Sequence, residues 1–320
     1  IYMNAVQLMT GRGGWPMSVF LNHQLKRFYA GTSWPPSQRM GMPGFSQVLD
    51  ALADALAKRR DDLETHAVEV TSALEQMAVG TNAAAAGMPP ESVIRDATEQ
   101  LLRVWDRKDG GFGGAPKFPH ATDLRLLLQR GLTSRQQPLI EAAELTLDRM
   151  AAGGIRDHVG GGFARYSVDA KWLVPHFEKM LYDNALLAEV YVRAWQITGH
   201  QRHAEVAAEI LDYVCREMVD SAGGVHCSED ADSEGVEGKF YVWTPREVRE
   251  VLGDERGELF CTIYDITDGG NFEGSNIPHL LRGLNEWAQE LSIETSVLAE
   301  QLAEDREQLR RARQGRVRPG

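Results

Sequence analysis

The chain has 320 residues, of which 43% are hydrophobic and 25% are charged, which is typical of a globular protein with an apolar core. Its formal net charge of −12 disfavours generic binding to nucleic acid, because the phosphate backbone is also negative. We find no signal-peptide pattern and no apolar run near the roughly 18 residues that a membrane helix needs. The length favours two domains, and we expect a cytoplasmic protein that binds neither nucleic acid nor membrane.

The number and spacing of the cysteines also fit a cytoplasmic protein. Cys215, Cys227 and Cys261 are far apart and form no Cys-x-x-Cys pair. This spacing indicates neither a disulfide framework nor a zinc site, and it fits a reducing environment. We therefore expect no metal and no cofactor.

The first part of the chain predicts a small α/β unit. Residues 1–10 have the pattern of a helix end, and the strand-like runs at 17–21 and 27–31 predict a β-hairpin around a short turn. A long helical pattern starts at Phe45. Because the chain opens on Ile1 inside a helical pattern and stops without a closing element, we expect a fragment cut at both ends.

A linker of small residues at 79–90, ending in two prolines, is the predicted domain boundary between 1–78 and 91–320. Beyond it the patterns are mostly helical, with one strand-like run at 239–243. The predicted helices are 91–107, 121–131, 137–152, 176–198, 201–219, 245–252 and 292–314. The arginines that follow residue 305 are interpreted as a solvated helix end and a linker.

A loose repeat organises this second part. Gly-Gly followed by an apolar residue recurs at 110–112, 161–163 and 223–225, and each interval accommodates two helices. A two-helix repeat cannot bury both of its faces alone, so the copies must stack. Polar, glycine-rich loops at the same end of every hairpin favour a ring of hairpins with a functional mouth.

The strongest candidate site lies at 165–184. If a helix begins at Pro175, then His176, Lys179 and Asp183 share one stripe, while Glu178 points away from them. The alternative is structural: Glu178 stabilises a helix N-terminus, Asp183 pairs with Lys179 and His176 only packs. The neighbouring Trp172 and Tyr166 favour a ligand site, because sugar rings pack on aromatic faces.

Two loops are further candidates for the rim of this site. The acidic run from Ser228 to Gly238 begins like a calcium loop, but its twelfth position is Tyr241 where the ion needs a glutamate. Asp230 and Asp232 lie on one face of an extended chain and are candidates for general acid–base work. Lys117 and His120 lie in the loop at 113–120. Either they contact substrate, or the glycines and prolines of this loop only shape a tight crossing of the chain.

Four motifs together resemble the spermatogenesis-associated-protein-20-like family of thioredoxin-domain proteins. They are Gly-Gly-Trp-Pro-Met-Ser-Val-Phe-Leu (13–21), Gly-Gly-Phe-Gly-Gly-Ala-Pro-Lys-Phe-Pro (110–119), the segment at 165–185 and the segment at 228–243. The resemblance implies a partial thioredoxin-like domain, then an incomplete (α/α)6 toroid of the six-hairpin glycosidase type. It also makes Pro16 a candidate cis-proline, and it places the family's redox-active segment upstream of Ile1.

These observations favour a carbohydrate-active or carbohydrate-binding cleft, with a sugar-like small molecule as its ligand and a protein partner for the thioredoxin-like part. The expected catalytic residues are His176, Glu178, Asp183, Asp230 and Asp232. The expected substrate-binding residues are Lys117, His120, Arg165, Tyr166, Trp172 and Lys179. Two alternatives remain open: a thiol redox module with a docking toroid, and a non-catalytic scaffold.

Overall fold

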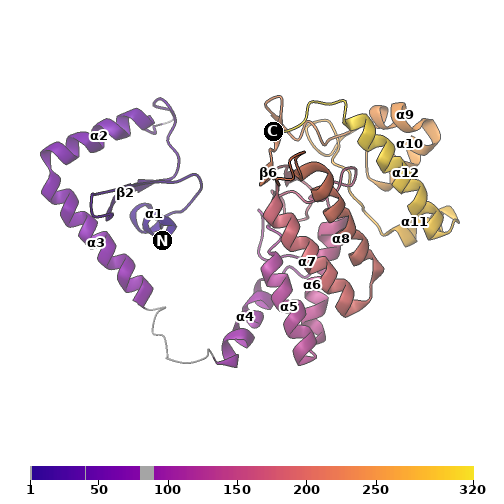
Figure 1. Ribbon diagram of the computed structural model, residues 1–320, viewed down its shortest axis with the longest axis horizontal. Helices are drawn as coiled ribbons and strands as arrows, with labels where there is room; N and C mark the ends of the chain where they lie inside the picture. The colour runs from indigo at the N-terminus through magenta and orange to yellow at the C-terminus, as the bar shows by residue number, and fades with distance from the viewer. Residues whose placement is uncertain (1, 40, 80–89) are drawn as a thin grey trace. The chain divides into compact units, whose positions relative to one another are not determined.

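The computed structural model describes residues 2–39, 41–79 and 90–320, which form two compact units, Ile1–Pro90 and Glu91–Gly320. Each unit is described by itself below (Figure 1). Apart from its two end residues, the predicted linker at 79–90 lies outside the described residues. None of the described helices combines the length and the hydropathy that crossing a bilayer requires.

The first unit pairs a short β-hairpin with helices. Its elements are α1 (Tyr2–Thr10), β1 (Ser18–Leu21), β2 (Arg27–Gly31), α2 (Phe45–Lys58) and α3 (Arg60–Val79). The two strands are antiparallel, as the sequence predicts, and β2 packs against both α1 and α3. The helical pattern that starts at Phe45 forms two helices, because the chain leaves helical geometry at Arg59.

Aromatic side chains fill the open face of this hairpin. The Tyr29 and Trp34 rings stack with centroids 6.2 Å apart, and Phe20 lies 6.0 Å from Tyr29. Gly31 is needed beneath Trp34, because an added Cβ would lie only 2.3 Å from the indole. The Trp15–Pro16 peptide bond, before β1, is cis.

The second unit is mostly helical and carries only two-residue strands. Its helices are α4 (Glu91–Val104), α5 (Ala121–Ser134), α6 (Gln137–Ala152), α7 (Leu181–Thr198), α8 (Gln201–Tyr213) with the π-helical turn η1 (Val214–Met218), α9 (Pro245–Leu252), α10 (Asp254–Ile263), α11 (Leu284–Leu291) and α12 (Thr295–Arg313). Its strands are β3 (Tyr166–Ser167), β4 (Pro175–His176), β5 (Lys179–Met180), β6 (Ser228–Glu229), β7 (Asp232–Ser233) and β8 (Val236–Glu237).

Helices pack in hairpins, with α5 against α6, α7 against α8 and α5 against α7 (Figure 1). Their shared core is apolar and fully buried, as shown by Leu124, Leu147 and Tyr191. A second core joins α9, α10, α11 and α12 around Phe260 and Leu298. The expected class is confirmed: the chain is mainly helical with a small α/β part, and its second unit is built from stacked helical hairpins.

The predicted start of the helix at 176 is wrong. Residues Pro175–His176 form β4, which pairs with Tyr166–Ser167, and Lys179–Met180 form β5, which pairs with Ser228–Glu229. Helix α7 therefore begins only at Leu181. As a result, His176, Lys179 and Asp183 do not share a helical stripe. The β3–β4 pair positions His176 and the β5–β6 pair positions Lys179, whereas Asp183 lies in the first turn of α7.

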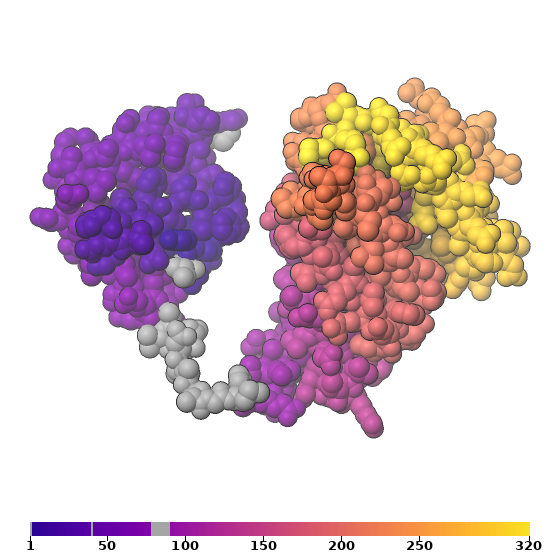
Figure 2. Space-filling model, in the orientation of Figure 1, coloured from indigo at the N-terminus to yellow at the C-terminus, as the bar shows by residue number. Residues whose placement is uncertain are grey.

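Two other expectations are wrong, because contacts with residues far away in the sequence again determine the local structure. The strand-like run at 239–243 forms a turn, because Phe240 and Tyr241 pack into the interior and only Trp243 forms a ladder bridge, to Asn276. The arginines after residue 305 are not a solvated linker. Arg313 is buried. Arg316 donates hydrogen bonds to the carbonyl oxygens of Phe240 and Val242, just after the acidic run that ends at Gly238. In the space-filling view, the yellow C-terminal residues lie against this orange loop (Figure 2).

Candidate active site at the loop ends of the helical hairpins

An aromatic wall forms where β3 pairs with β4. The register of this pair sets Tyr166 opposite His176, and their rings stack with centroids 5.0 Å apart. The ring of Phe118, from the loop before α5, lies 4.8 Å from Tyr166 on the same wall. Phe118 is 41% exposed, and Tyr166 and His176 are half-buried. The wall is therefore open to a ligand.

Charged side chains frame this wall. Arg165 donates from Nη1 to Oε2 of Glu178 over 2.7 Å, and the backbone N–H of Arg165 donates to the Glu178 carbonyl oxygen. Oε1 of Glu237 lies 2.7 Å from Nδ1 of His176. Oε2 of Glu178 lies 3.9 Å from Nε2 of the same imidazole. The imidazole is thus held between two carboxylates.

Asp183 adds a carboxyl group with unusual electrostatics. Burial raises the pKa of Asp183 to about 6, and the nearby guanidinium of Arg165 only partly offsets that effect. The Oδ2 atom of Asp183 is buried and has no hydrogen-bond partner among the described residues. A carboxyl group of this kind changes protonation near neutral pH, as a general acid or base requires.

We call these side chains the Arg165 cluster: Arg165, Tyr166, His176, Glu178, Asp183 and Glu237. Five of the six are named among the candidate residues of the sequence analysis. Sequence reasoning missed Glu237, which is placed by the β7–β8 pair. No local pattern in the sequence connects Glu237 to a histidine 61 residues away.

Two predicted substrate-binding residues are interior instead. The Lys117 side chain is fully buried and its Nζ donates to Oδ2 of Asp106 and to the carbonyl oxygens of Gly110 and Ala170, over 2.6 to 2.8 Å. Trp172 is also fully buried, and its indole N–H donates to the carbonyl oxygen of Asp109. These contacts satisfy both side chains and hold the loop before α5 in place.

Lys179 is likewise interior. Its Nζ lies 2.9 Å from Oδ2 of Asp157 and lies over the rings of Tyr213 and Tyr241. Arg313 makes a second, bidentate contact with the same Asp157 carboxylate. Burial alone raises the pKa of Asp157, but Arg313 and Lys179 outweigh it and hold that pKa far below the usual range. The sequence analysis did not predict that Asp157, Arg313 and the two tyrosines form a buried cluster around Lys179.

Two hollows flank this buried ion cluster. One is lined by Arg310, Arg318 and Glu229 together with Arg313 of the cluster. The other is lined by Asp157 of the cluster and by Ile277. Its lining includes His158, whose pKa falls to about 3 because of burial and the nearby Arg156. Lys179 and Tyr241 line both hollows.

The remaining candidates lie at the surface. His120 is exposed and lies 3.1 Å from Oδ2 of Asp123. Asp230 and Asp232 are both exposed, and among the described residues neither forms an ion pair with a member of the Arg165 cluster. Asp232 does lie opposite Glu237 in the β7–β8 pair, which sets it beside the cluster. The Glu144, His200 and His203 side chains form a separate group elsewhere in this unit.

Known proteins with similar sequences indicate the family of this chain. Residues 1–75 match a family model described as Thioredox_DsbH, a protein of unknown function, DUF255. Over 319 residues the chain is 38% identical to spermatogenesis-associated protein 20 of Homo sapiens and, equally, of Mus musculus, covering 92% of this chain. It is 34% identical over 298 residues to an uncharacterized protein of Caenorhabditis elegans. The chain spans about 40% of the length of these relatives.

Two solved structures align with part of this chain at low sequence identity. Cellobiose 2-epimerase from Bacillus thermoamylovorans aligns at 15% identity with a TM-score of 0.39, covering 54% of this chain and 55% of that one. A sugar epimerase from a ruminal bacterium aligns at 14% identity with a TM-score of 0.39, covering 68% and 69%.

Proposed function

Because sequence similarity confirms the resemblance to the spermatogenesis-associated-protein-20-like family, we propose a function for the second unit of such a protein. The Arg165 cluster binds a sugar-like small molecule and transfers a proton to or from it. The protein acts in the cytoplasm, and its thioredoxin-like part contacts a protein partner. The reaction is of the epimerase or glycosidase kind.

One observation carries this proposal. The buried Oδ2 atom of Asp183 has no hydrogen-bond partner in the described structure, and burial raises the pKa of its carboxyl group to about 6. An unpaired buried carboxyl oxygen costs free energy unless a ligand or a proton satisfies it. A hydroxyl group of a bound sugar supplies the missing donor.

The surrounding groups suit the same ligand. The wall of Phe118, Tyr166 and His176 offers an apolar face for the C–H side of a sugar ring. Arg165 and Glu178 offer a donor and an acceptor for hydroxyl groups at its rim. Glu237 holds Nδ1 of His176 and so orients the imidazole, whose Nε2 then exchanges protons with substrate.

A panel of mono- and disaccharides, tested by thermal shift on the full-length protein, probes this proposal. We expect at least one sugar to raise the melting temperature of the wild type and of His226→Ala, which changes an exposed histidine outside the cluster. The same sugar should give no shift with His176→Ala or Tyr166→Ala. Equal shifts in all four proteins, or no shift with any sugar, would refute the proposal.

A thiol redox function is the second candidate, and the match of residues 1–75 to the Thioredox_DsbH model favours it. All three cysteines of this chain lie after residue 200, outside that match. The function therefore needs a cysteine pair elsewhere in the full-length protein, because a nucleophilic thiolate needs a resolving partner. Reduction of a disulfide substrate by the full-length protein, independent of sugar, would support this candidate.

A further inference from the structure

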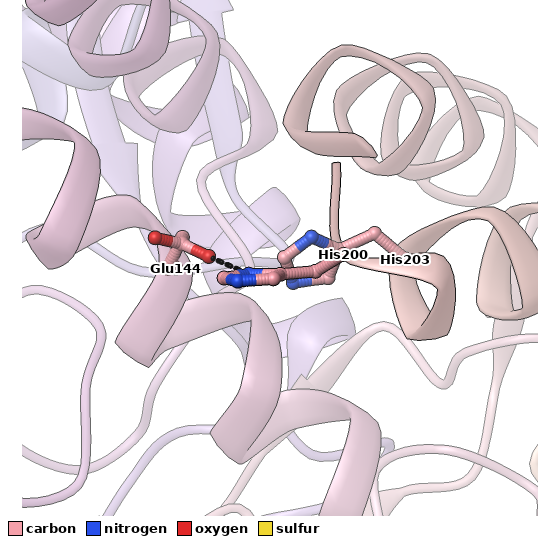
Figure 3. Close-up of side chains that lie close together, drawn as sticks. All are labelled: Glu144, His200 and His203. Atoms are coloured by element: carbon pink, nitrogen blue, oxygen red, sulfur yellow. Dashed lines mark hydrogen bonds and ion pairs between the residues drawn. The ribbon is translucent and has the colours of Figure 1, made fainter. Parts of the chain in front are cut away.

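A group of metal-ligand side chains lies between α6 and the start of α8, outside the Arg165 cluster. Glu144 is on α6, His200 is the residue before α8, and His203 is in the first turn of α8. One ligand atom from each lies within 4.8 Å of the other two. Figure 3 shows the three side chains converging, with a contact between Glu144 and His200.

The start of α8 brings the two histidines together. His200 is the extended residue before the helix, His203 lies in its first turn, and their ring centroids are 6.0 Å apart. Oε1 of Glu144 already lies 2.7 Å from Nδ1 of His200, which binds the α7–α8 turn to α6. A tetrahedral ion with bonds of about 2.0–2.1 Å holds its ligand atoms about 3.3–3.4 Å apart, between the 2.7 Å of this contact and the 4.8 Å that spans the group.

The contacts of His203 suit a metal ligand. Its side chain is 1% exposed, and Nε2 lies 3.2 Å from Oδ1 of Asp148. The tautomer with its proton on Nε2 donates to that carboxylate and leaves the lone pair on Nδ1. That Nδ1 is buried and has no partner in the described structure. A carboxylate that orients a histidine through its other nitrogen is the usual outer support of a zinc ligand.

We propose that Glu144, His200 and His203 bind one divalent transition-metal ion, with Zn²⁺ as the best fit. Two imidazoles and one carboxylate are ligands that this ion favours, and three protein ligands leave a fourth position for water. The ion joins α6 to the α7–α8 turn, so it stabilises the packing of two neighbouring hairpins. The candidate ligands are all remote from the three cysteines in the sequence.

Arg202 competes with the ion. Its guanidinium makes two hydrogen bonds to Asp148 and lies 3.6 Å from Oε1 of Glu144. Its positive charge repels a cation at this distance and partly neutralises the acidic ligand. Removal of this charge should therefore strengthen metal binding, whereas a general loss of structure in this region would weaken it.

Calorimetric titration of the chelator-treated, full-length protein with Zn²⁺ tests the proposal. We expect one equivalent to bind, at least tenfold more weakly in His200→Ala and in Glu144→Gln, and more tightly in Arg202→Gln. The exposed His226→Ala serves as a matched control and should bind like the wild type. The circular dichroism spectrum of each variant checks its fold before the titration.

Co²⁺ is the second probe, since its absorption spectrum identifies the ligands. Nitrogen and oxygen ligands give visible bands without thiolate charge transfer, and this is the expected result. Equal Zn²⁺ affinity in the wild type, His200→Ala and Glu144→Gln would overturn the proposal. A Co²⁺ spectrum with thiolate charge transfer for the strongest site would also overturn it, because the ion would then be bound by cysteine.

Discussion

Nη1 of Arg165 lies 2.7 Å from Oε2 of Glu178, and this ion pair links the loop before β3 to the segment between β4 and β5. The Oδ2 atom of Asp183, in the first turn of α7, is buried and has no hydrogen-bond partner in the described structure. Burial raises the pKa of this carboxyl group to about 6, and the charge of Arg165 only partly offsets that effect.

The raised pKa of Asp183 predicts a pH-dependent cost in stability. The pKa of this carboxyl group is about 6 in the folded protein and 3.8 in an unfolded chain, so the unfolded state loses its proton first and folding stability falls as pH rises from about 4 to 6. Asp183→Asn removes this cost. We expect the variant to gain roughly 1 kcal/mol relative to the wild type between pH 4 and pH 7, a figure discounted for partial exposure.

Denaturant unfolding at several pH values measures this difference. Asp232→Asn is the matched control, because Asp232 is exposed on the neighbouring β7. A stability difference between Asp183→Asn and the wild type that stays constant from pH 4 to pH 7 would contradict the assignment.

Removal of the Asp157 carboxylate should strongly destabilise the second unit. Asp157→Asn leaves Lys179 and Arg313 as buried charges without their anion. Loss of one partner of a buried ion pair costs about 3–5 kcal/mol. Glu234→Gln breaks only the exposed pair with Lys239 and should cost about 0–1 kcal/mol.

Urea unfolding followed by circular dichroism compares the two variants. Because the Asp157 pKa is lowered, its contribution should persist down to about pH 4 and disappear as the pH falls further toward the lowered pKa. Similar small losses in both variants would show that the buried ion cluster contributes little.

Lys117→Met tests whether this lysine stabilises the folded state or binds the ligand. The substitution leaves Asp106 and two carbonyl oxygens without the ammonium that they share. We expect a loss of several kcal/mol in unfolding free energy, since each unpaired buried group costs about 1–3 kcal/mol. Lys239→Met, at an exposed lysine, is the control. A normally stable Lys117→Met protein with weakened sugar binding would restore the substrate-binding role.

The start of α9 offers a local test of helix capping. Oγ1 of Thr244 accepts from the backbone N–H of Glu247, and Oε2 of Glu247 accepts from the backbone N–H of Thr244. Thr244→Ala should cost about 1 kcal/mol. Thermal unfolding measures the loss; an unchanged melting temperature would mean that α9 does not depend on this cap.

Much of the fold was predictable because helix periodicity is a local signal. The bounds of α6 and α9 agree with the predicted ranges 137–152 and 245–252, and the hairpin of β1 and β2 lies where it was expected. The sequence analysis did not anticipate α10, which follows α9 after Gly253 alone, or α11, a helix of 8 residues. The π-helical turn at Val214–Met218 ends the predicted helix 201–219 in a different geometry.

The candidate site was harder to predict, because contacts between residues far apart in the sequence determine where its side chains lie. Pro175 suits a helix start, yet pairing with Ser167 makes it part of a strand. The sequence around Lys179 indicates a polar side chain at a helix tip. In the structure Lys179 is buried against the Asp157 carboxylate, 22 residues before it, and the Tyr241 ring, 62 residues after it. Neither partner is visible from residue types or spacing around Lys179.

The most direct test of the proposed function is the pH dependence of sugar affinity. Isothermal titration of the full-length protein with the best sugar from the panel, from pH 5 to pH 8, should show a change in affinity centred near pH 6. The Asp183→Asn protein should still fold and should lose this transition. The same pH profile in the wild type and in Asp183→Asn would contradict the assignment of Asp183 as the acid–base group of the Arg165 cluster.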